Sequence, residues 1–476
     1  MNAKPLLSRE SMPEPAKRAL PERVLQFGEG VFLRGYFDWM LQQMNRQGLF
    51  NGSALVIKPR PHGSGITDLN AQGGTFTLWT RGEAGGKAID SLELIGSISR
   101  GLNPAQDWER YLAAAAQPEL RFVVSNTTEA GLSYAAEKRP EFACPAGFPA
   151  KLTAFLYRRF QHFEGGASKG MIVIPLELLE NNGQRLKSAV MQHAADWKLE
   201  PVFSAWVEKH CRFINSLVDR IVPGKPADLP SLDYRDELLV CCEPYHLLVL
   251  EAEQDLGGEL PLAKAGLNVR FVKDLAPYRE LKLRILNGAH SYMASLGFLM
   301  GCDSVSDCLQ RQDFRVLLER LLGEAAEVLA LPKDEIRSYT ASVLERFQNP
   351  YLRHPLANIA MNCSSKFKAR LLPTLLDGQR LKKRLPKACV SALAALFVYQ
   401  RGQRASGSYA IQDEPAALAY FGRFWALGNG LEKRCPEFLA DAGFWGQNLA
   451  KLPGLADALA LEIGELLRLA PALSAR

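Results

Sequence analysis

The chain has 476 residues, of which 47% are hydrophobic and 23% charged, so it is long enough for two hydrophobic cores and its composition excludes a disordered or fibrous protein. The 57 basic and 51 acidic residues give a formal charge of +6, which for this length does not indicate a nucleic-acid partner. Nine cysteines and seven histidines are scattered, with no C-x-x-C spacing, so we expect neither a disulfide framework nor a metal site.

The opening of the chain, residues 1–24, mixes charge and proline and contains no apolar run of the length that a secretory signal requires. No later stretch approaches the roughly 18 uninterrupted apolar residues of a membrane span. We therefore expect a cytoplasmic protein that does not enter a membrane.

The next segment has the strand, turn and helix pattern that begins a nucleotide-binding βαβ unit. Arg23–Phe27 predicts a short buried strand, Gly28–Gly30 a tight turn, Val31–Asn45 an amphipathic helix and Ser53–Ile57 a second strand. Further strands are predicted at Phe76–Thr80, Arg121–Ser125 and Met171–Pro175, with helices at Trp108–Ala116 and Ala150–Phe163. This alternation predicts an α/β fold with a mostly parallel sheet covered on both faces.

The turn after the first strand is a partial match to G-x-G-x-x-G, in which glycines let the backbone approach a pyrophosphate at a helix N-terminus. Leu33 stands where the third glycine would be, and no acidic residue follows Ile57 to bind the ribose of NAD. A plain packing role for the glycines is an equal alternative. The candidate cofactor-binding residues of this segment are Phe27, Gly28, Gly30, Phe32 and Arg34.

Two basic residues, Lys58 and Arg60, follow the second strand. Basic side chains at this point can receive the 2′-phosphate of NADP, so the residues alone leave the choice between NAD and NADP open. A polar loop of small residues, Ser125–Gly131, ends a later strand and suits the lining of a nicotinamide pocket, although a solvated turn is the alternative. Its candidate cofactor-binding residues are Asn126, Thr127, Thr128 and Glu129.

From about Pro277 the pattern changes to amphipathic helices, predicted at Leu281–Leu299, Asp313–Leu329, Pro332–Phe347, Ala388–Tyr399, Glu414–Gly422 and Leu455–Leu469. Strand signals nearly vanish. We therefore expect a Rossmann-type dinucleotide-binding domain at residues 1–275, followed by an all-helical C-terminal domain at residues 276–476.

The first of these helices carries three polar residues that suit hydride-transfer chemistry. At about 100° per residue, Lys282, Asn287 and His290 fall within an arc of roughly 140°. A lysine can take the hydroxyl proton of an alcohol, an asparagine can donate to the oxygen as charge develops on it, and a histidine can hold a substrate hydroxyl. A polar surface is the ordinary alternative, but Asn287-Gly288 lies inside an apolar helix, where both residues cost stability.

Basic residues accumulate further on, at Lys366, Lys368, Arg370, Arg380, Lys382, Lys383, Arg384 and Lys387, with Asp377 as the only acid among them. A solvated helix face and loop is the ordinary interpretation of such a run. A nearby anionic substrate or cofactor phosphate is the alternative.

Over nearly its whole length the chain resembles the mannitol dehydrogenase family, the polyol-specific long-chain dehydrogenases, and within it the members that reduce keto-uronates. The likeness rests on Gln26–Gly30 with Phe32–Arg34, Phe122–Gly131, Leu217–Val222, Ile285–His290 and Arg346–Tyr351. The family's K-x-x-x-x-N-x-x-H signature falls on Lys282, Asn287 and His290. The resemblance implies catalytic roles for these three residues, an active site between a Rossmann-like and a helical domain, and no metal.

The resemblance also implies an activity, the reversible reduction of D-tagaturonate to D-altronate with NADH. Mannitol dehydrogenases carry a second asparagine in a C-D-N stretch that aligns with Leu176-Glu177-Leu178, so that donor is missing here. Its absence favours a sugar acid as the substrate, and a cationic side chain is the natural clamp for a carboxylate. The candidate substrate-binding residues are Arg346, His354, Lys366 and Arg370.

Two alternatives remain. The first is the same chemistry on another substrate, as a fructuronate reductase or a mannitol-type polyol 2-dehydrogenase. The second, more remote one is a non-catalytic nucleotide- or nucleic-acid-binding protein, which leaves Lys282, Asn287 and His290 without a task. We expect a small-molecule sugar-acid substrate, no nucleic acid, no membrane, and a monomer or small homo-oligomer.

Overall fold

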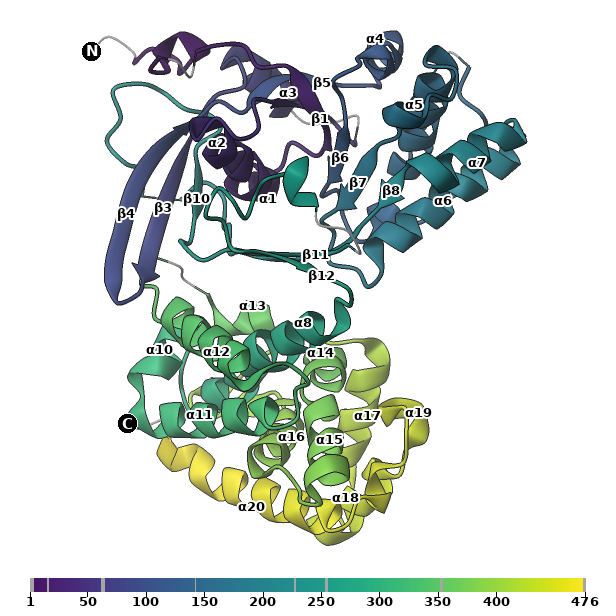
Figure 1. The fold of residues 1–476 in the computed structure, drawn as a ribbon. Coiled ribbons are helices and arrows are strands. Elements are labelled where there is room, and N and C mark those ends of the chain that lie inside the picture. Colours follow the sequence, from purple (N-terminus) through teal and green to yellow (C-terminus); the bar gives the residue numbers. More distant parts are fainter. Residues whose placement is uncertain are drawn as a thin grey trace. The chain divides into compact units, whose positions relative to one another are not determined.

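The computed structural model describes residues 4–14, 17–60, 65–141, 143–226, 228–252, 256–351 and 354–473. The chain divides into two compact units, Met1–Leu275 and Ala276–Arg476 (Figure 1). The first unit is built on β-sheets and the second on helices, which confirms the predicted fold class.

The centre of the first unit is a six-stranded parallel sheet with the order β5-β2-β1-β6-β7-β8. Along the chain, the strands are β1 Glu22–Phe27, β2 Ser53–Ile57, β5 Ile98–Leu102, β6 Phe122–Ser125, β7 Ile172–Pro175 and β8 Arg212–Phe213. The order runs outward from β1 in one direction and from β6 in the other. This is the doubly wound arrangement, whose ligands bind outside the carboxyl ends of the strands at the point of reversal, here between β1 and β6.

Two hydrophobic cores lie on opposite faces of this sheet because successive strand residues point to opposite sides. Val24 and Val124 belong to one core, and Leu25 and Val123 to the other. The helical elements of the unit are α1 Val31–Leu33, a π-turn Arg34–Asp38, α2 Trp39–Arg46, α3 Gly65–Ala71, α4 Trp108–Ala113, α5 Phe148–His162, α6 Asn182–Asp196 and α7 Pro201–His210. The run from α1 to α2 packs on the first core, and α5, α6 and α7 pack on the second.

Two small mixed sheets complete the first unit. One has the order β10-β3-β4 and the other β12-β11-β9. Their strands are β3 Phe76–Ala84, β4 Lys87–Ile95, β9 Asn215–Asp219, β10 Val240–Cys242, β11 Leu247–Glu251 and β12 Val269–Val272. The predicted strand at Phe76–Thr80 is therefore confirmed, but it leaves the parallel sheet and pairs antiparallel with β4.

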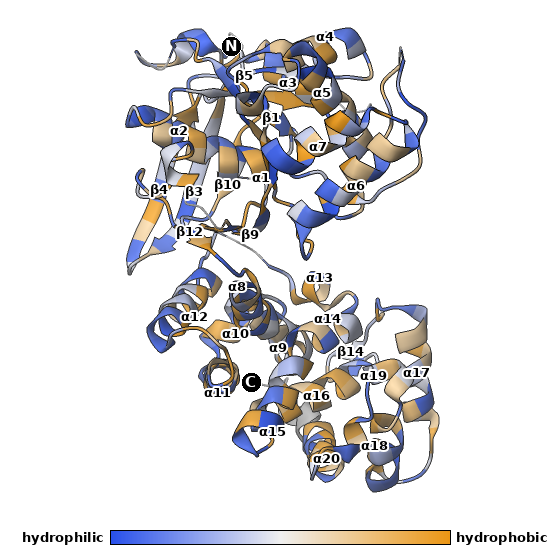
Figure 2. Cartoon of the chain, turned by 45° about the vertical axis from the view of Figure 1, so that its right-hand side comes forward, coloured by the Kyte–Doolittle hydropathy of each residue, from blue (hydrophilic) through white to orange (hydrophobic). Residues whose placement is uncertain are grey.

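In its described residues, the second unit is built of helices, and its named strands form one short hairpin, β13 Gln403–Arg404 with β14 Gly407–Ser408. Its α-helices are α8 Ala276–Leu281, α9 Gly288–Tyr292, α10 Val305–Gln310, α11 Gln312–Ala326, α12 Lys333–Phe347, α13 Leu356–Ala360, α14 Cys363–Arg370, α15 Leu372–Lys382, α16 Lys387–Tyr399, α17 Pro415–Ala426, α18 Leu431–Leu439, α19 Ala442–Trp445 and α20 Leu455–Leu473. The apolar helix α16 forms the core, with α11, α14, α15 and α20 packed against it (Figure 2). In the described residues, no helix combines the length and apolar character that a membrane crossing demands.

Candidate cofactor and substrate sites

The predicted cofactor residues gather at the carboxyl edge of the parallel sheet. Gly28 follows β1, Lys58 follows β2, and Asn126 follows β6. The amide of Gly28 donates to the Ile57 carbonyl (3.0 Å), and the amide of Asn126 donates to the Phe27 carbonyl (3.1 Å). The three strand ends are therefore tied together at the reversal point, where a doubly wound sheet binds its ligand.

Gly28 is required by the fold itself. Its φ of +127° lies where side chains are strained, and an added Cβ would stand 2.9 Å from both the Asn126 carbonyl oxygen and the Leu33 side chain. Leu33, in the position of the third glycine, is buried against this turn. The close helix packing that a third glycine permits is found instead at Gly35, whose added Cβ would stand 2.7 Å from Val222 Cγ1.

Gly30 differs, because nothing in the fold demands a glycine there. Its φ of −68° suits any residue, and no heavy atom of the described residues lies within 4 Å of the position that a Cβ would take. Gly30 caps a helical run that continues to Arg46, and the first amides of a helix have no partner within the helix. The space and the amides fit a pyrophosphate, so the residues present are suited to a dinucleotide.

The other cofactor candidates of this segment are buried or half-buried around the turn. The ring of Phe27 is fully buried against Tyr111 and Phe148, so Phe27 presents only its backbone to the crevice. Arg34 is also buried, and its Nη1 donates to the Glu29 carbonyl. Phe32 is half-buried and its ring stacks on that of Tyr36.

The two basic residues after β2 have different surroundings. Lys58 is 2% exposed, and its amide donates to the Leu102 carbonyl (2.9 Å). Arg60 is exposed. Arg60 is therefore the accessible one of the two side chains. It follows the end of β2, where a doubly wound fold holds the adenosine ribose.

The loop after β6 is held by a residue that the sequence analysis did not select, Glu177. Its carboxylate follows β7, is 3% exposed, and accepts bonds from Ser125 Oγ (3.0 Å), the Thr127 amide (2.9 Å) and Thr127 Oγ1 (3.0 Å). Asn126 Nδ2 donates to the Leu176 carbonyl (2.9 Å), whereas Thr128 and Glu129 are exposed. The pKa of Glu177 is raised by burial, against which the hydrogen bonds act.

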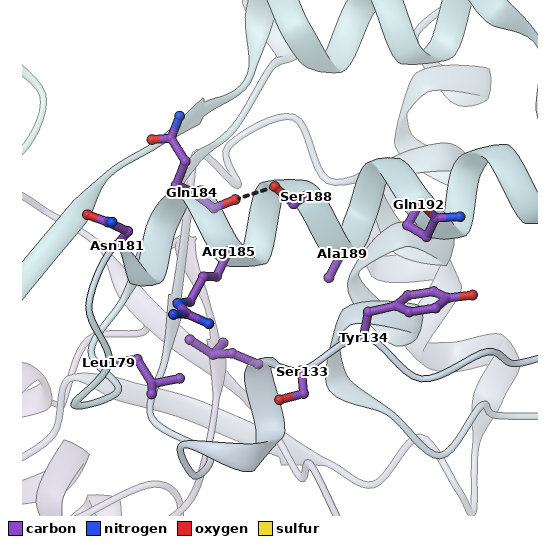
Figure 3. Close-up of a pocket in the computed structure, with 10 residues that line it drawn as sticks. Ser133, Tyr134, Leu179, Asn181, Gln184, Arg185, Ser188, Ala189 and Gln192 are labelled. Carbon is purple, nitrogen blue, oxygen red and sulfur yellow. Dashed lines mark hydrogen bonds between the residues drawn. The ribbon is translucent and has the colours of Figure 1, made fainter. Parts of the chain in front are cut away.

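A pocket of about 730 Å³ adjoins the segment after Glu177 (Figure 3). It lies between α6 and the segment around Ser133, and Arg185 extends into it from α6. The Nε of Arg185 donates to the Glu180 carbonyl (2.8 Å), and Ser188 Oγ donates to the Gln184 carbonyl (3.0 Å). None of its lining residues was predicted to contact the cofactor.

In the second unit, the helical run from Ala276 to Gly297 contains two π-turns, and the first spans Lys282–Asn287. We call this run the Lys282 helix. The Gly288 amide reaches the Leu283 carbonyl, five residues back. In a π-turn, residues five apart lie one above the other, as residues four apart do in an α-helix.

The π-turn narrows the angle around the helix axis that separates Lys282 from Asn287. Asn287 lies one π-turn beyond Lys282, and His290 follows Asn287 at the i+3 spacing that shares a helix face. All three side chains are half-buried, whereas Arg284, Ile285, Leu286, Gly288 and Ala289 are buried. The spacing K-x-x-x-x-N-x-x-H therefore places an amine, an amide and an imidazole in one row.

Gly288 has a packing reason that the sequence did not reveal. A Cβ there would stand 3.2 Å from Leu371 Cδ2, at the start of α15. The unfavourable glycine in this helix is therefore explained by close packing, and only Asn287 remains as a sign of functional constraint.

His290 stands against two other aromatic rings. Its ring centroid is 4.7 Å from that of Phe347 and 5.8 Å from that of His354. Burial, and then the charge of Arg346, lower the pKa of His354. Arg346 itself is 5% exposed, so this substrate candidate is a buried side chain.

Lys366 and Arg370 lie one turn apart on α14, which packs against the Lys282 helix. Arg370 Nη1 donates to Ser291 Oγ (3.1 Å) and the Asn287 carbonyl (3.4 Å), and Lys366 Nζ donates to the Ile359 carbonyl (2.9 Å). Burial lowers the pKa of Arg370 to about 10, and burial together with the Arg370 charge lowers that of Lys366. Two close, partly desolvated cations favour an anion beside them.

Among the described residues, no group of three or more His, Cys, Asp or Glu side chains is arranged to hold a metal ion.

Family models match both units. The model described as the mannitol dehydrogenase Rossmann domain matches residues 22–264, and the model of the mannitol dehydrogenase C-terminal domain matches residues 274–466.

Three curated relatives share the length of the chain, and each is named altronate oxidoreductase. The relative from Bacillus subtilis (strain 168) is 41% identical over 94% of this chain and 93% of its own. That from Halalkalibacterium halodurans is 39% identical over 93% and 90%, and that from Klebsiella pneumoniae (strain 342) is 38% identical over 94% and 95%.

Two solved structures share the fold. Substrate-free D-sorbitol dehydrogenase matches with a TM-score of 0.80 and 21% identity over 99% of this chain and 100% of that one. Pseudomonas fluorescens mannitol 2-dehydrogenase, solved as a ternary complex with NAD and D-mannitol, matches with a TM-score of 0.69 and 23% identity over 98% of both chains.

Proposed function

The chain belongs to the mannitol dehydrogenase family, and we propose that it is an NAD-dependent, metal-independent oxidoreductase that interconverts D-altronate and D-tagaturonate. The observation that carries the substrate is the pair of cations on α14, because Arg370 donates to the Asn287 carbonyl and to Ser291 Oγ on the Lys282 helix, and Lys366 lies one turn from Arg370. A sugar acid has a carboxylate that such a pair of cations can bind, whereas mannitol and fructose have no carboxylate. The relatives named altronate oxidoreductase support the same class of substrate.

We assign the chemistry to the row on the Lys282 helix. When bound, NAD would supply the acceptor for the hydride that leaves the carbinol carbon of altronate. Lys282 takes the hydroxyl proton as the ketone forms and returns it in the reductive direction. Asn287 donates a hydrogen bond to the oxygen as its negative charge develops, and His290 binds a substrate hydroxyl.

Arg370 is the side chain that we assign to the substrate carboxylate. Only its Nη1 is engaged, and across the described ranges Nε and Nη2 have no protein partner. A guanidinium with two free donors can form charge-assisted bonds to a carboxylate while Nη1 stays anchored to the Lys282 helix. Lys366 adds a second positive charge one turn away.

We propose that residues 1–275 form the cofactor domain and residues 276–476 the domain that carries the catalytic and substrate-binding residues. Gly30 and the loop held by Glu177 support the first assignment. We propose NAD as the cofactor. NADP is the alternative, because the exposed Arg60 could bind its 2′-phosphate, and the assay therefore includes NADPH. We also propose that the enzyme acts in the cytoplasm, as a monomer or small homo-oligomer, and without nucleic acid.

The test is a panel of substrates, with turnover measured as the loss of absorbance of the reduced cofactor. D-Tagaturonate, D-fructuronate and D-fructose are each assayed with NADH and with NADPH. The proposal expects the highest kcat/KM for tagaturonate with NADH. A higher value for fructuronate or fructose moves the assignment to that substrate, and no turnover with any of them overturns the enzymatic assignment.

A further inference from the structure

We propose that Glu177 supplies a fixed negative charge beneath the nicotinamide and thereby favours binding of the oxidised, cationic cofactor over NADH. The inference rests on the proposed function, because it needs NAD in the crevice at the carboxyl edge of the sheet. A doubly wound fold binds one nucleotide over each half of its sheet. With the adenosine ribose beside the end of β2, the nicotinamide half lies toward β6 and β7, where Glu177 stands.

The carboxylate of Glu177 is a buried charge without a cation. It is 3% exposed, and within the described residues no lysine, arginine or histidine forms an ion pair with it. Burying an unpaired charge is costly, so its presence at the ligand-binding edge of the sheet points to a ligand as its counter-charge. The oxidised nicotinamide ring carries the positive charge that fits.

The hydrogen bonds hold Glu177 in place and favour its ionised form, against the burial that raises its pKa. Its contacts are donors only: the Thr127 amide and Thr127 Oγ1 both donate to Oε1, and Ser125 Oγ donates to Oε2. A protonated carboxyl would keep its contact with Ser125 only if the hydroxyl turned to accept, and it would lose one of the bonds that the carboxylate now accepts. Glu177 is thus also the positioning residue of the loop, because its carboxylate fixes Ser125 and Thr127 at the end of β6.

A pair of variants separates the charge from the geometry. In Glu177→Gln, the amide oxygen keeps both bonds from Thr127, and the amide nitrogen donates to Ser125 Oγ, which turns to accept. The charge is lost while the loop stays. In Ser125→Ala, the charge stays and one hydrogen bond is lost.

The experiment measures the dissociation constants of NAD⁺ and NADH for the full chain and both variants, by fluorescence titration without substrate. Two unit charges about 10 Å apart, at an effective dielectric constant of about 20, change affinity on the order of 10-fold. We therefore expect Glu177→Gln to raise Kd(NAD⁺)/Kd(NADH) about 10-fold and Ser125→Ala to leave the ratio within about 2-fold. An unchanged ratio in Glu177→Gln, or an equal change in both variants, overturns the inference and leaves Glu177 as a loop anchor only.

Failure of NAD as the proposed cofactor has a different signature, since the unaltered chain would then bind neither NAD⁺ nor NADH, and a different sugar substrate would change the substrate panel but not these titrations. A second measurement avoids variants and guards against misfolding of Glu177→Gln. The unaltered chain is titrated with ADP-ribose, which lacks the nicotinamide. We expect NAD⁺ to bind at least about 10-fold more tightly than ADP-ribose, and equal affinities would contradict a charge placed under the ring.

Discussion

Arg370 is anchored to the Lys282 helix through Nη1, and the proposed function assigns the rest of its guanidinium to the substrate carboxylate. Hydrogen bonds to charged groups contribute about 1.5–3 kcal/mol, so Arg370→Ala should lower kcat/KM for tagaturonate about 10- to 100-fold. The loss should appear mainly in KM, with the Kd for NADH unchanged, and steady-state kinetics with a parallel NADH titration measure both.

A matched control comes from the same basic stretch. Arg380 is exposed and pairs with Asp377 (2.7 Å), so Arg380→Ala should leave both constants within about 2-fold. If both variants change KM equally, the effect belongs to the overall positive charge, and Arg370 has no place at the carboxylate.

Single residues also show what the sequence can and cannot provide. Lys282, Asn287 and His290 could be selected from the sequence because one helix carries all three, and their catalytic roles stay a prediction. Glu177 was not selected, because its partners Ser125 and Thr127 are about fifty residues away and become neighbours only through the pairing of β6 with β7. The buried state of Arg346 was also beyond the sequence, since it depends on packing around His354.

At the scale of elements, the two glycines of the first turn should respond differently to alanine. Gly28→Ala meets a φ of +127° and the Asn126 carbonyl, so it should lower the melting temperature of the protein. Gly30→Ala fits the fold but fills the space proposed for the pyrophosphate. Overpacking costs about 1–3 kcal/mol, so Gly30→Ala should raise the Kd for NADH about 10- to 100-fold with little change in melting temperature.

Thermal unfolding without cofactor and NADH titration distinguish these outcomes. Destabilisation by Gly30→Ala, or unchanged NADH binding, would show that the open space at the helix N-terminus does not receive the dinucleotide.

The helical run that begins at Val31 also contains a buried acid, Asp38. Burial raises its pKa from 3.8 to about 7, against the opposing effects of the Gln26 hydrogen bond and the Arg34 charge. Between these values the folded chain holds a proton that the unfolded chain has lost, so stability is full below about pH 4 and falls as pH rises through about 7.

Asp38→Asn removes this dependence because its side chain is neutral at every pH. The variant should gain stability relative to the unaltered protein between pH 4 and 7, by roughly 4 kcal/mol at most, and the difference should level off above pH 7. Urea unfolding at pH 5, 6, 7 and 8 measures it. A difference that does not vary with pH would contradict a raised pKa for Asp38.

Helix and strand boundaries followed closely from local patterns. β2 is found at Ser53–Ile57 as predicted, and α12 begins one residue after the predicted start. The π-turn at Lys282–Asn287 was not predicted, because a helical wheel of about 100° per residue assumes an uninterrupted α-helix. The wheel therefore overstated the arc between Lys282 and Asn287.

At the scale of the whole molecule, the fold class followed from the change of pattern near Pro277 and was confirmed. The division of the first unit into one parallel sheet and two small sheets did not follow. Local sequence shows that Phe76–Thr80 is extended, but the partners of β3 are β4, next in the chain, and β10, about 160 residues later. Pairing over such distances is fixed by the packing of the complete chain.

The proposed reaction depends on proton transfer by Lys282 beside a bound dinucleotide. The sheet supplies a dinucleotide crevice, and the second unit supplies the Lys282 helix with Arg370 anchored to it. If Lys282 is the acid and base of this reaction, removing its amine should slow catalysis without changing the binding of the cofactor.

The most direct test is the kinetics of Lys282→Ala beside Lys382→Ala, a variant of an exposed lysine on α15. Acid–base catalysis contributes about 10²- to 10⁴-fold, so Lys282→Ala should lower kcat for tagaturonate by that factor. Its melting temperature and Kd for NADH should match those of the unaltered protein and of Lys382→Ala. A folded Lys282→Ala enzyme that binds NADH and retains near-normal kcat would contradict the assignment.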